Sequence, residues 1–159
     1  MALLEHPHKA LVVEVTEDSF SMAHGYEQAL QGRTDIGAVV SFTGLVRDFN
    51  ESPDVLGLTL EHYPGMTERS LMEIAEQAWQ RWSLQAVRII HRVGDLAPGD
   101  PIVRVLVASA HRRDAFLACD FIMDYLKTQA PFWKKERARQ GAYWVKERKT
   151  DQQDAERWS

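Results

Sequence analysis

Two lysines flank a proline-containing break in the chain, and their type and spacing make them candidates for catalysis. Lys127 and Lys134 bracket the sequence TQAPFW, in which Pro131 ends a helical pattern and an extended pattern follows. A turn at this break would bring both amines together, and a lysine crowded by other cations or by apolar rings has a lowered pKa. Such an amine is a usable base, acid or nucleophile at neutral pH. The alternative interpretation is that both lysines face solvent beside a proline turn.

A second candidate lies where a strand is predicted to end and a helix to begin. The sequence SAHRR at 109–113 places His111 and Arg112 at this junction. The free N–H groups of a helix N-terminus favour phosphate, and Arg112 can add a bidentate guanidinium while His111 supplies a donor or a proton relay. The alternative is a solvated corner of the surface.

Other polar positions give weaker signals. Arg47 closes a strand-like run in which Gly44 permits close approach of a ligand or a neighbouring chain. Arg148 lies in a mixed charge run near the C-terminus, which is typical of a solvated face. Cys119 lies among apolar residues of a predicted helix and is interpreted as a packed core thiol. His62 has no second ligand at a metal-binding spacing, so no metal site is expected.

Composition limits the classes of function. The 159 residues are 45% hydrophobic and 26% charged, which is typical of one soluble domain, and the net charge of -4 gives no general attraction to nucleic acid or anionic membranes. A single cysteine excludes an internal disulfide. No apolar run approaches the roughly 18 residues that span a bilayer, and no signal peptide is evident, so a cytoplasmic protein is expected. Glycine-rich phosphate loops, GxSxG elbows and dinucleotide fingerprints are absent from the sequence.

Hydrophobic periodicity predicts an α+β fold with mostly antiparallel strands in a single compact domain. Residues 1–9 are expected to be flexible, residues 10–159 to form the domain, and residues 48–54 to form a surface loop. Strands are expected at 11–15, 36–46, 56–60, 87–93, 102–110, 133–138 and 142–146, and helices at about 18–30, 67–82 and 114–128. The order of the strands within a sheet is left open.

Several blocks of sequence resemble the large, catalytic subunit of molybdopterin synthase, over nearly the whole chain from about residue 10 to Trp158. The blocks are GAVVSFTG at 37–44 with VR at 46–47, LEHYPGMTE at 60–68, SAHR at 109–112, FIMDYLKT at 121–128 and APFWKKE at 130–136. The N-terminal segment and the loop at 48–54 show no pattern of that family.

The resemblance implies a hammerhead-like α/β subunit that forms a homodimer and binds one small ubiquitin-like partner at each end, giving a heterotetramer. The C-terminal Gly-Gly tail of the partner carries a thiocarboxylate. Two sulfurs pass in turn to cyclic pyranopterin monophosphate and build the dithiolene of molybdopterin, in molybdenum cofactor biosynthesis. The chain would then be a sulfurtransferase with no reactive cysteine and no cofactor of its own.

The same resemblance assigns roles to individual residues. Lys127 is expected to be the catalytic lysine, acting as acid, base or transient acyl acceptor, and Lys134 to stabilise developing negative charge. Four residues are expected to bind the substrate, with the last reaching across the dimer interface: Arg47, His111, Arg112 and Arg148. Two other classes of function remain open, namely a non-catalytic scaffold that binds a ubiquitin-like tail and a phosphate-ligand enzyme that works without a protein partner.

Overall fold

The structure is a computed structural model that describes residues 2–21, 23–47, 55–138, 141–145 and 149–159. Strands and helices follow one another along the chain, with the longest helices after β4 and β7. In chain order the elements are β1 (Ala2–Glu5), β2 (Leu11–Thr16), α1 (Tyr26–Leu30), β3 (Ala38–Leu45), β4 (Val55–His62), α2 (Met66–Arg81), β5 (Ala86–Arg92), β6 (Gly94–Leu96), β7 (Pro101–Ser109), α3 (Arg112–Gln129), β8 (Phe132–Ala138), β9 (Gly141–Val145) and α4 (Lys149–Glu156).

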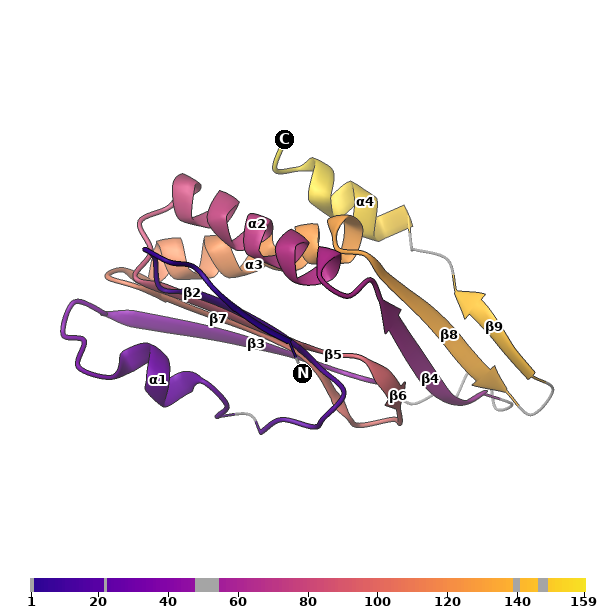
Figure 1. The fold of residues 1–159 in the computed structure, drawn as a ribbon. Coiled ribbons are helices and arrows are strands. Elements are labelled where there is room, and N and C mark those ends of the chain that lie inside the picture. The colour runs from indigo at the N-terminus through magenta and orange to yellow at the C-terminus, as the bar shows by residue number, and fades with distance from the viewer. Residues whose placement is uncertain (1, 22, 48–54, 139–140, 146–148) are drawn as a thin grey trace.

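A five-stranded sheet forms the larger layer, in the order β1-β2-β5-β7-β3. Its central strands β5 and β7 come from the apolar runs AVRIIHR and PIVRVLVAS, which are buried along most of their length and so read as strands covered on both faces. Helices α2 and α3 pack side by side on one face, whereas the short α1 lies on the other (Figure 1). The strand β3 forms one edge of this sheet.

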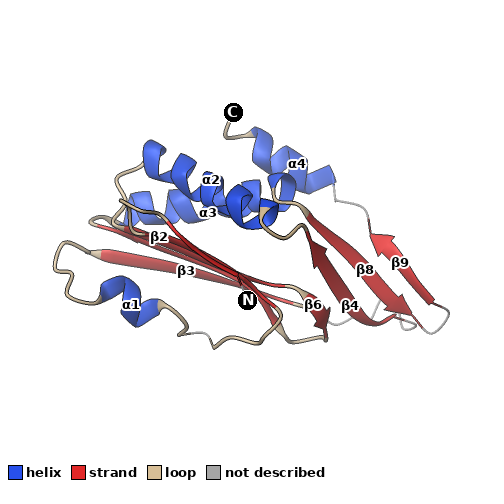
Figure 2. Ribbon diagram, viewed as in Figure 1, coloured by secondary structure: helices blue, strands red, loops and turns tan. Residues whose placement is uncertain are grey.

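A smaller four-stranded sheet, in the order β6-β4-β8-β9, stands beside the C-terminal end of α3 (Figure 2). All of its pairings are antiparallel. Strand β8 begins three residues after α3 ends, so the last turn of α3 and the start of β8 form one corner of the molecule. The helix α4 packs against α3.

The two long helices bury apolar stripes at helical spacing. In α2 the buried residues include Leu71, Ile74 and Ala78, and in α3 they include Ile122 and Leu126. These stripes close a core on the sheet that also takes in the inner faces of β2, β5 and β7. Packed in this way, α3 lies along the strands of the sheet (Figure 1).

The predicted class of fold is confirmed. Among the described residues, the pairing of β2 with β5 is parallel and the other six strand pairings are antiparallel. The predicted strands at 36–46, 87–93 and 102–110, the helices at 67–82 and 114–128 and the C-terminal hairpin all have counterparts in the structure, with ends shifted by one or two residues. In the described part of the chain, no helix is long and apolar enough to span a bilayer.

The predicted helix at about 18–30 is wrong over its first two turns, because α1 begins only at Tyr26. Gly25 precedes it with a φ of 77°, a left-handed conformation that interrupts an α-helix. A Cβ at Gly25 would lie 2.6 Å from the Nε atom of Arg88, so this glycine also lets the loop pass close to the sheet. His24 secures the loop through a contact of 3.1 Å between its Nε2 atom and Glu14 Oε1.

Three elements were not predicted, and one of them is the short strand β6, which pairs with β4 in the smaller sheet. The strand β1 lies inside the N-terminal segment 1–9 and pairs antiparallel with β2. Leu3 and Leu4 thereby extend the edge of the sheet. The helix α4 follows the C-terminal hairpin, in a stretch whose polar composition gave no apolar periodicity. The predicted loop at 48–54 lies outside the described residues.

Candidate functional site

The two candidate lysines lie at one corner of the molecule. Lys127 is in the last turn of α3, and Lys134 is the third residue of β8. The helix stops between them because Ala130, which precedes Pro131, takes an extended conformation with a ψ of 133°, as residues before proline do. Both lysine side chains are exposed. The predicted turn between the two lysines is therefore present.

The segment between the lysines is held in place by α2. The hydroxyl of Thr67, which is fully buried, donates to the carbonyl oxygen of Pro131 at 3.0 Å and accepts from the backbone N–H of Tyr63 at 2.9 Å. The backbone N–H of Gly65 donates to Glu68, which closes the turn before α2. The start of β8 is thus tied to the start of α2 by hydrogen bonds through the buried side chain of Thr67.

A buried histidine packs on the same segment. The ring of His91, from β5, stacks on the ring of Phe132, with centroids 3.9 Å apart. The pKa of His91 is lowered to about 4, mainly by burial and also by the charges of Lys134 and His62, while a hydrogen bond with the carbonyl of Arg92 acts in the opposite direction. The His91 Nδ1 atom lies 2.9 Å from that carbonyl oxygen, so in the neutral ring Nδ1 carries the proton.

The register of β8 separates its lysines by face. Lys134 lies opposite Leu60 of β4, and Phe132 lies opposite His62, so these four residues share the face that meets His91. Lys135 points to the other face, where its Nζ atom lies 5.2 Å from the centre of the Trp144 ring. Adjacent lysines of one strand therefore occupy different environments.

The second predicted site lies at the start of α3. His111 is the N-cap residue and Arg112 the first residue of the helix; both are exposed. The hydroxyl of the buried Ser109 donates to the carbonyl of Ser83 at 2.7 Å and accepts from the backbone N–H of His111 at 3.4 Å. No side chain caps this helix within the described residues, so the N-terminal N–H groups of α3 remain open to an anion.

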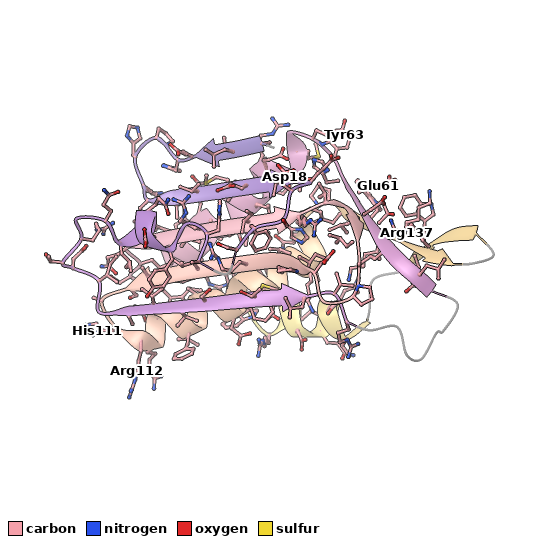
Figure 3. All side chains as sticks on the ribbon, turned by 90° about the horizontal axis from the view of Figure 1, so that it is seen from below. Asp18, Glu61, Tyr63, His111, Arg112 and Arg137 are labelled. Carbon is pink, nitrogen blue, oxygen red and sulfur yellow. The ribbon has the colours of Figure 1, made fainter. Side chains whose placement is uncertain are left out.

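The structure does not bring the two predicted sites together within one chain. Arg112 and Lys127 are 15 residues apart on the same helix, which at 1.5 Å per residue separates them by about 22 Å. Figure 3 places His111 and Arg112 at one end of the five-stranded sheet, whereas Glu61 and Arg137 mark the four-stranded sheet at the other end. One small substrate cannot touch both sites in the same chain.

Arg47 lies at the lysine end of the molecule. It follows β3, and the adjacent Val46 is fixed by a hydrogen bond of 2.9 Å from its N–H to the carbonyl of Asp100. The strand β3 runs antiparallel to β7, and α3 returns over β7, so β3 and α3 point the same way. Their far ends, with Arg47 and Lys127, therefore lie at the same end. Arg148 lies outside the described residues.

Cys119 is a core residue, as predicted. It is buried in α3, and burial raises the pKa of Cys119 to about 12, so its thiol stays protonated at neutral pH. Sulfur chemistry at this site must therefore use a sulfur from elsewhere.

Sequence reasoning missed two residues that contact the lysine corner, which consists of Lys127, Lys134 and the segment between them. Asp151 of α4 lies 3.6 Å from Lys127, measured from Oδ1 to Nζ, and His91 lies under Phe132. His91 stands in an apolar strand pattern, which could have marked it as a buried titratable group. Asp151 gave no signal, because its contact depends on how α4 docks.

The geometry defines a class: an α+β protein whose cationic residues lie at the two ends of one helix. The family model described as MoaE protein matches residues 15–129. The molybdopterin synthase catalytic subunit of Vibrio cholerae is 57% identical over 146 residues, covering 92% of this chain and 97% of that protein. The chain therefore belongs to the MoaE family of molybdopterin synthase catalytic subunits.

Solved structures of similar proteins agree with this assignment to the family. Molybdopterin cofactor biosynthesis protein E from Burkholderia multivorans is 47% identical with a TM-score of 0.80, covering 95% of this chain and 97% of that chain. The molybdopterin synthase structure from Staphylococcus aureus is 30% identical with a TM-score of 0.76, covering 84% of this chain and 96% of that chain.

Proposed function

We propose that this chain transfers sulfur from the C-terminal thiocarboxylate of a small ubiquitin-like partner to cyclic pyranopterin monophosphate, forming the dithiolene of molybdopterin. The observation that carries the proposal is the pair Lys127 and Lys134 on either side of a rigidly held turn. Two amines at a fixed corner suit a reaction in which an anionic sulfur attacks and negative charge develops on an acyl oxygen.

Each transfer makes one carbon–sulfur bond and breaks another. The thiocarboxylate sulfur bonds to a substrate carbon as a carbon–oxygen bond at that carbon breaks and its oxygen leaves with a proton. Water then adds to the acyl carbon of the tail and the acyl carbon–sulfur bond breaks, so the partner leaves as a carboxylate and the sulfur stays on the substrate. Lys127 serves as acid, base or transient acyl acceptor, and Lys134 stabilises the oxyanion. The sulfur comes from the partner, which is consistent with the buried, protonated thiol of Cys119.

The substrate pocket is formed by two copies of this chain. His111 and Arg112 are about 22 Å from Lys127 within one chain, so a phosphate bound at the start of α3 reaches the lysines of a second copy instead. Arg47 adds a guanidinium at the lysine end of the molecule. Arg148 is proposed to bind the substrate across the interface between the two copies. This arrangement uses the homodimer that the family resemblance implies.

The exposed edge of β3 is the surface on which the second copy pairs. Phe42 and Leu45 of this strand and Phe116 of α3 are exposed apolar side chains along this edge, and an apolar edge strand is a template for another strand. A two-fold antiparallel pairing centred between Ser41 and Phe42 sets Leu45 opposite Ala38 of the second copy. Because Ala38 lies beside Ser109 in β7, the second copy's His111 then comes close to Arg47.

The test is a reconstitution of purified chain, thiocarboxylated partner and cyclic pyranopterin monophosphate, with product measured as its fluorescent oxidised derivative. Lys127→Ala is compared with Lys135→Ala, its matched control on the outer face of β8. We expect product from wild type and from Lys135→Ala, and a loss of about a hundredfold or more with Lys127→Ala.

Three outcomes would contradict the proposal. Near-full turnover by a folded Lys127→Ala would remove the lysine from the mechanism. Wild-type chain that binds the partner without making product would indicate a scaffold that only holds the partner's tail, and full activity without any partner would indicate a phosphate-ligand enzyme.

A further inference from the structure

The C-terminal helix α4 supplies an acid to the lysine corner. Asp151, in the first turn of α4, lies 3.6 Å from Lys127, measured from Oδ1 to Nζ. The Asp151 side chain is only 14% exposed, whereas that of Lys127 is 52% exposed. The carboxylate is therefore held under the amine, while the amine still reaches solvent and a substrate. The match to the family model ends at residue 129, so it does not include Asp151.

The position of α4 does not depend on Asp151. The guanidinium of Arg157 lies 2.7 Å from both Asp120 and Asp124 of α3, and the indole N–H of Trp158 donates to Asp124. Arg81 of α2 donates to the carbonyl of Trp158 at 2.6 Å. These contacts with the carboxylate of Asp124, itself buried, anchor the helix at its far end.

The contacts lie along one face of α3. Asp120, Asp124 and Lys127 are spaced at i, i+4 and i+7, which places them in a row on the helix surface. Arg157 meets the acidic end of this row and Asp151 meets Lys127, so α4 runs antiparallel to α3 with complementary charges. Because Arg157 and Trp158 dock on α3, Asp151 is placed beside Lys127.

We infer that Asp151 is a positioning residue that holds the Lys127 ammonium in the orientation needed for sulfur transfer. The inference rests on the proposed role of Lys127. A lysine side chain has four rotatable bonds and spreads over many rotamers unless a partner restrains it. Charge-assisted contact with a fixed carboxylate selects the rotamers in which Nζ stays at the corner beside Pro131. Asp151 acts through Lys127 and does not touch the substrate.

The test compares Asp151→Asn and Asp151→Glu with the matched control Asp154→Asn, an exposed acid one turn further along α4. We expect kcat to fall about tenfold in Asp151→Asn with KM values for partner and substrate within about twofold, because misplacement of a reacting group costs rate rather than binding. Asp151→Glu should recover most of kcat, since it restores the charge. The melting temperature should stay close to that of wild type in all three variants, because Arg157 and Trp158 still anchor α4 and the Lys127 amine remains solvated.

A second readout measures Lys127 itself. Acetylation by acetic anhydride, followed by peptide mass spectrometry, gives the labelling rate of each lysine. We expect Asp151→Asn to raise the rate at Lys127 about threefold, because loss of a paired carboxylate frees the amine, and to leave the rate at Lys135 unchanged.

The outcomes separate the two claims. If Lys127→Ala is inactive but Asp151→Asn has wild-type kcat and wild-type labelling, the positioning role is overturned while the proposed function stands. A melting temperature lowered in Asp151→Asn together with loss of activity in Asp154→Asn would show that α4 as a whole stabilises the fold, and would also overturn the role. If Lys127→Ala keeps full turnover, the proposed function itself fails.

Discussion

His91 and Phe132 stack with ring centroids 3.9 Å apart and ring planes 23° apart. One ring comes from the five-stranded sheet and the other from the first residue of β8. This contact and the Thr67 hydrogen bond to Pro131 fix the segment that joins the two lysines. The lysine corner is therefore held by the buried side chains of His91 and Thr67, although the amines themselves are exposed.

The buried imidazole predicts a loss of stability in mild acid. The pKa of His91 is lowered from the ordinary 6.5 to about 4. Above pH 6.5 the ring is neutral in both the folded and unfolded chain. As the pH falls towards 4, the unfolded chain takes up a proton that the folded one does not, so the free energy of unfolding decreases. Between pH 7 and pH 5 this contributes a loss of about 2 kcal/mol.

Urea unfolding at both pH values measures this loss. His91→Asn keeps an N–H donor and does not titrate, so its free energy of unfolding should fall by about 2 kcal/mol less than that of wild type over the same interval. His8→Gln is the control, since His8 is exposed, and it should follow wild type. An equal pH dependence in His91→Asn and wild type would show that His91 does not titrate as a buried group.

Thr67 gives a prediction that links stability to rate. Thr67→Val keeps the shape but leaves the carbonyl of Pro131 and the N–H of Tyr63 without the hydroxyl, at a cost of about 1–3 kcal/mol in unfolding free energy. The freed Pro131 segment should also lower kcat, because it carries the lysine corner. Thr67→Ser retains the hydroxyl and should restore both quantities.

Thr59→Val is the matched control for Thr67→Val. Its hydroxyl donates to Asp95 at 2.7 Å in an exposed part of β4, so water can replace the lost partner and little change is expected. Urea unfolding and steady-state kinetics on the same preparations give both quantities. A Thr67→Val variant with wild-type kcat would mean that the linker does not position the lysines.

The lysine corner could be predicted from sequence because it is local. Pro131 and the apolar pattern of α3 fix where the helix stops, and both act within a few residues. The separation of Arg112 from Lys127 was also present in the sequence, since both fall on or beside one predicted helix. The distance between the two residues follows from the number of helical residues between them and the rise per residue.

The features that sequence reasoning got wrong or missed depend on tertiary contacts. The helix expected at 18–30 gave way to a loop because Gly25 packs against Arg88 on the sheet, and neither the glycine's φ nor that neighbour follows from local propensity. The contact of Asp151 with Lys127 depends on Trp158 and Arg157 docking on α3. Such contacts join residues more than twenty positions apart, so no local pattern encodes them.

Cys119 predicts insensitivity to thiol reagents. Its thiol is buried, and burial raises its pKa to about 12, so iodoacetamide at pH 8 should neither label it nor reduce turnover. Cys119→Ala should keep wild-type kcat and lose about 1–2 kcal/mol in unfolding free energy, from the small cavity it leaves. Mass spectrometry of the treated protein and urea unfolding measure the two effects. Rapid labelling of the folded protein with loss of turnover would contradict the assignment of Cys119 to the core.

A pocket shared between two copies predicts complementation between inactive variants. Lys127→Ala and Arg112→Ala damage opposite ends of α3. In a mixed dimer, one of the two pockets receives Lys127 from one chain and Arg112 from the other, and so is intact. Half of the dimers formed from an equal mixture are mixed, and each has one intact pocket of two, so turnover should recover to about a quarter of wild type.

The control for complementation is a mixture of Lys127→Ala with Lys134→Ala. Both lysines belong to the same corner of the same chain, so every pocket in such a mixed dimer lacks one of them and turnover should stay at the level of the single variants. The chains are mixed under conditions that exchange subunits, and the fluorescent product assay reads the result. Recovery with the lysine pair, or none with Lys127→Ala and Arg112→Ala after exchange is confirmed by mass, would contradict a pocket built across two copies.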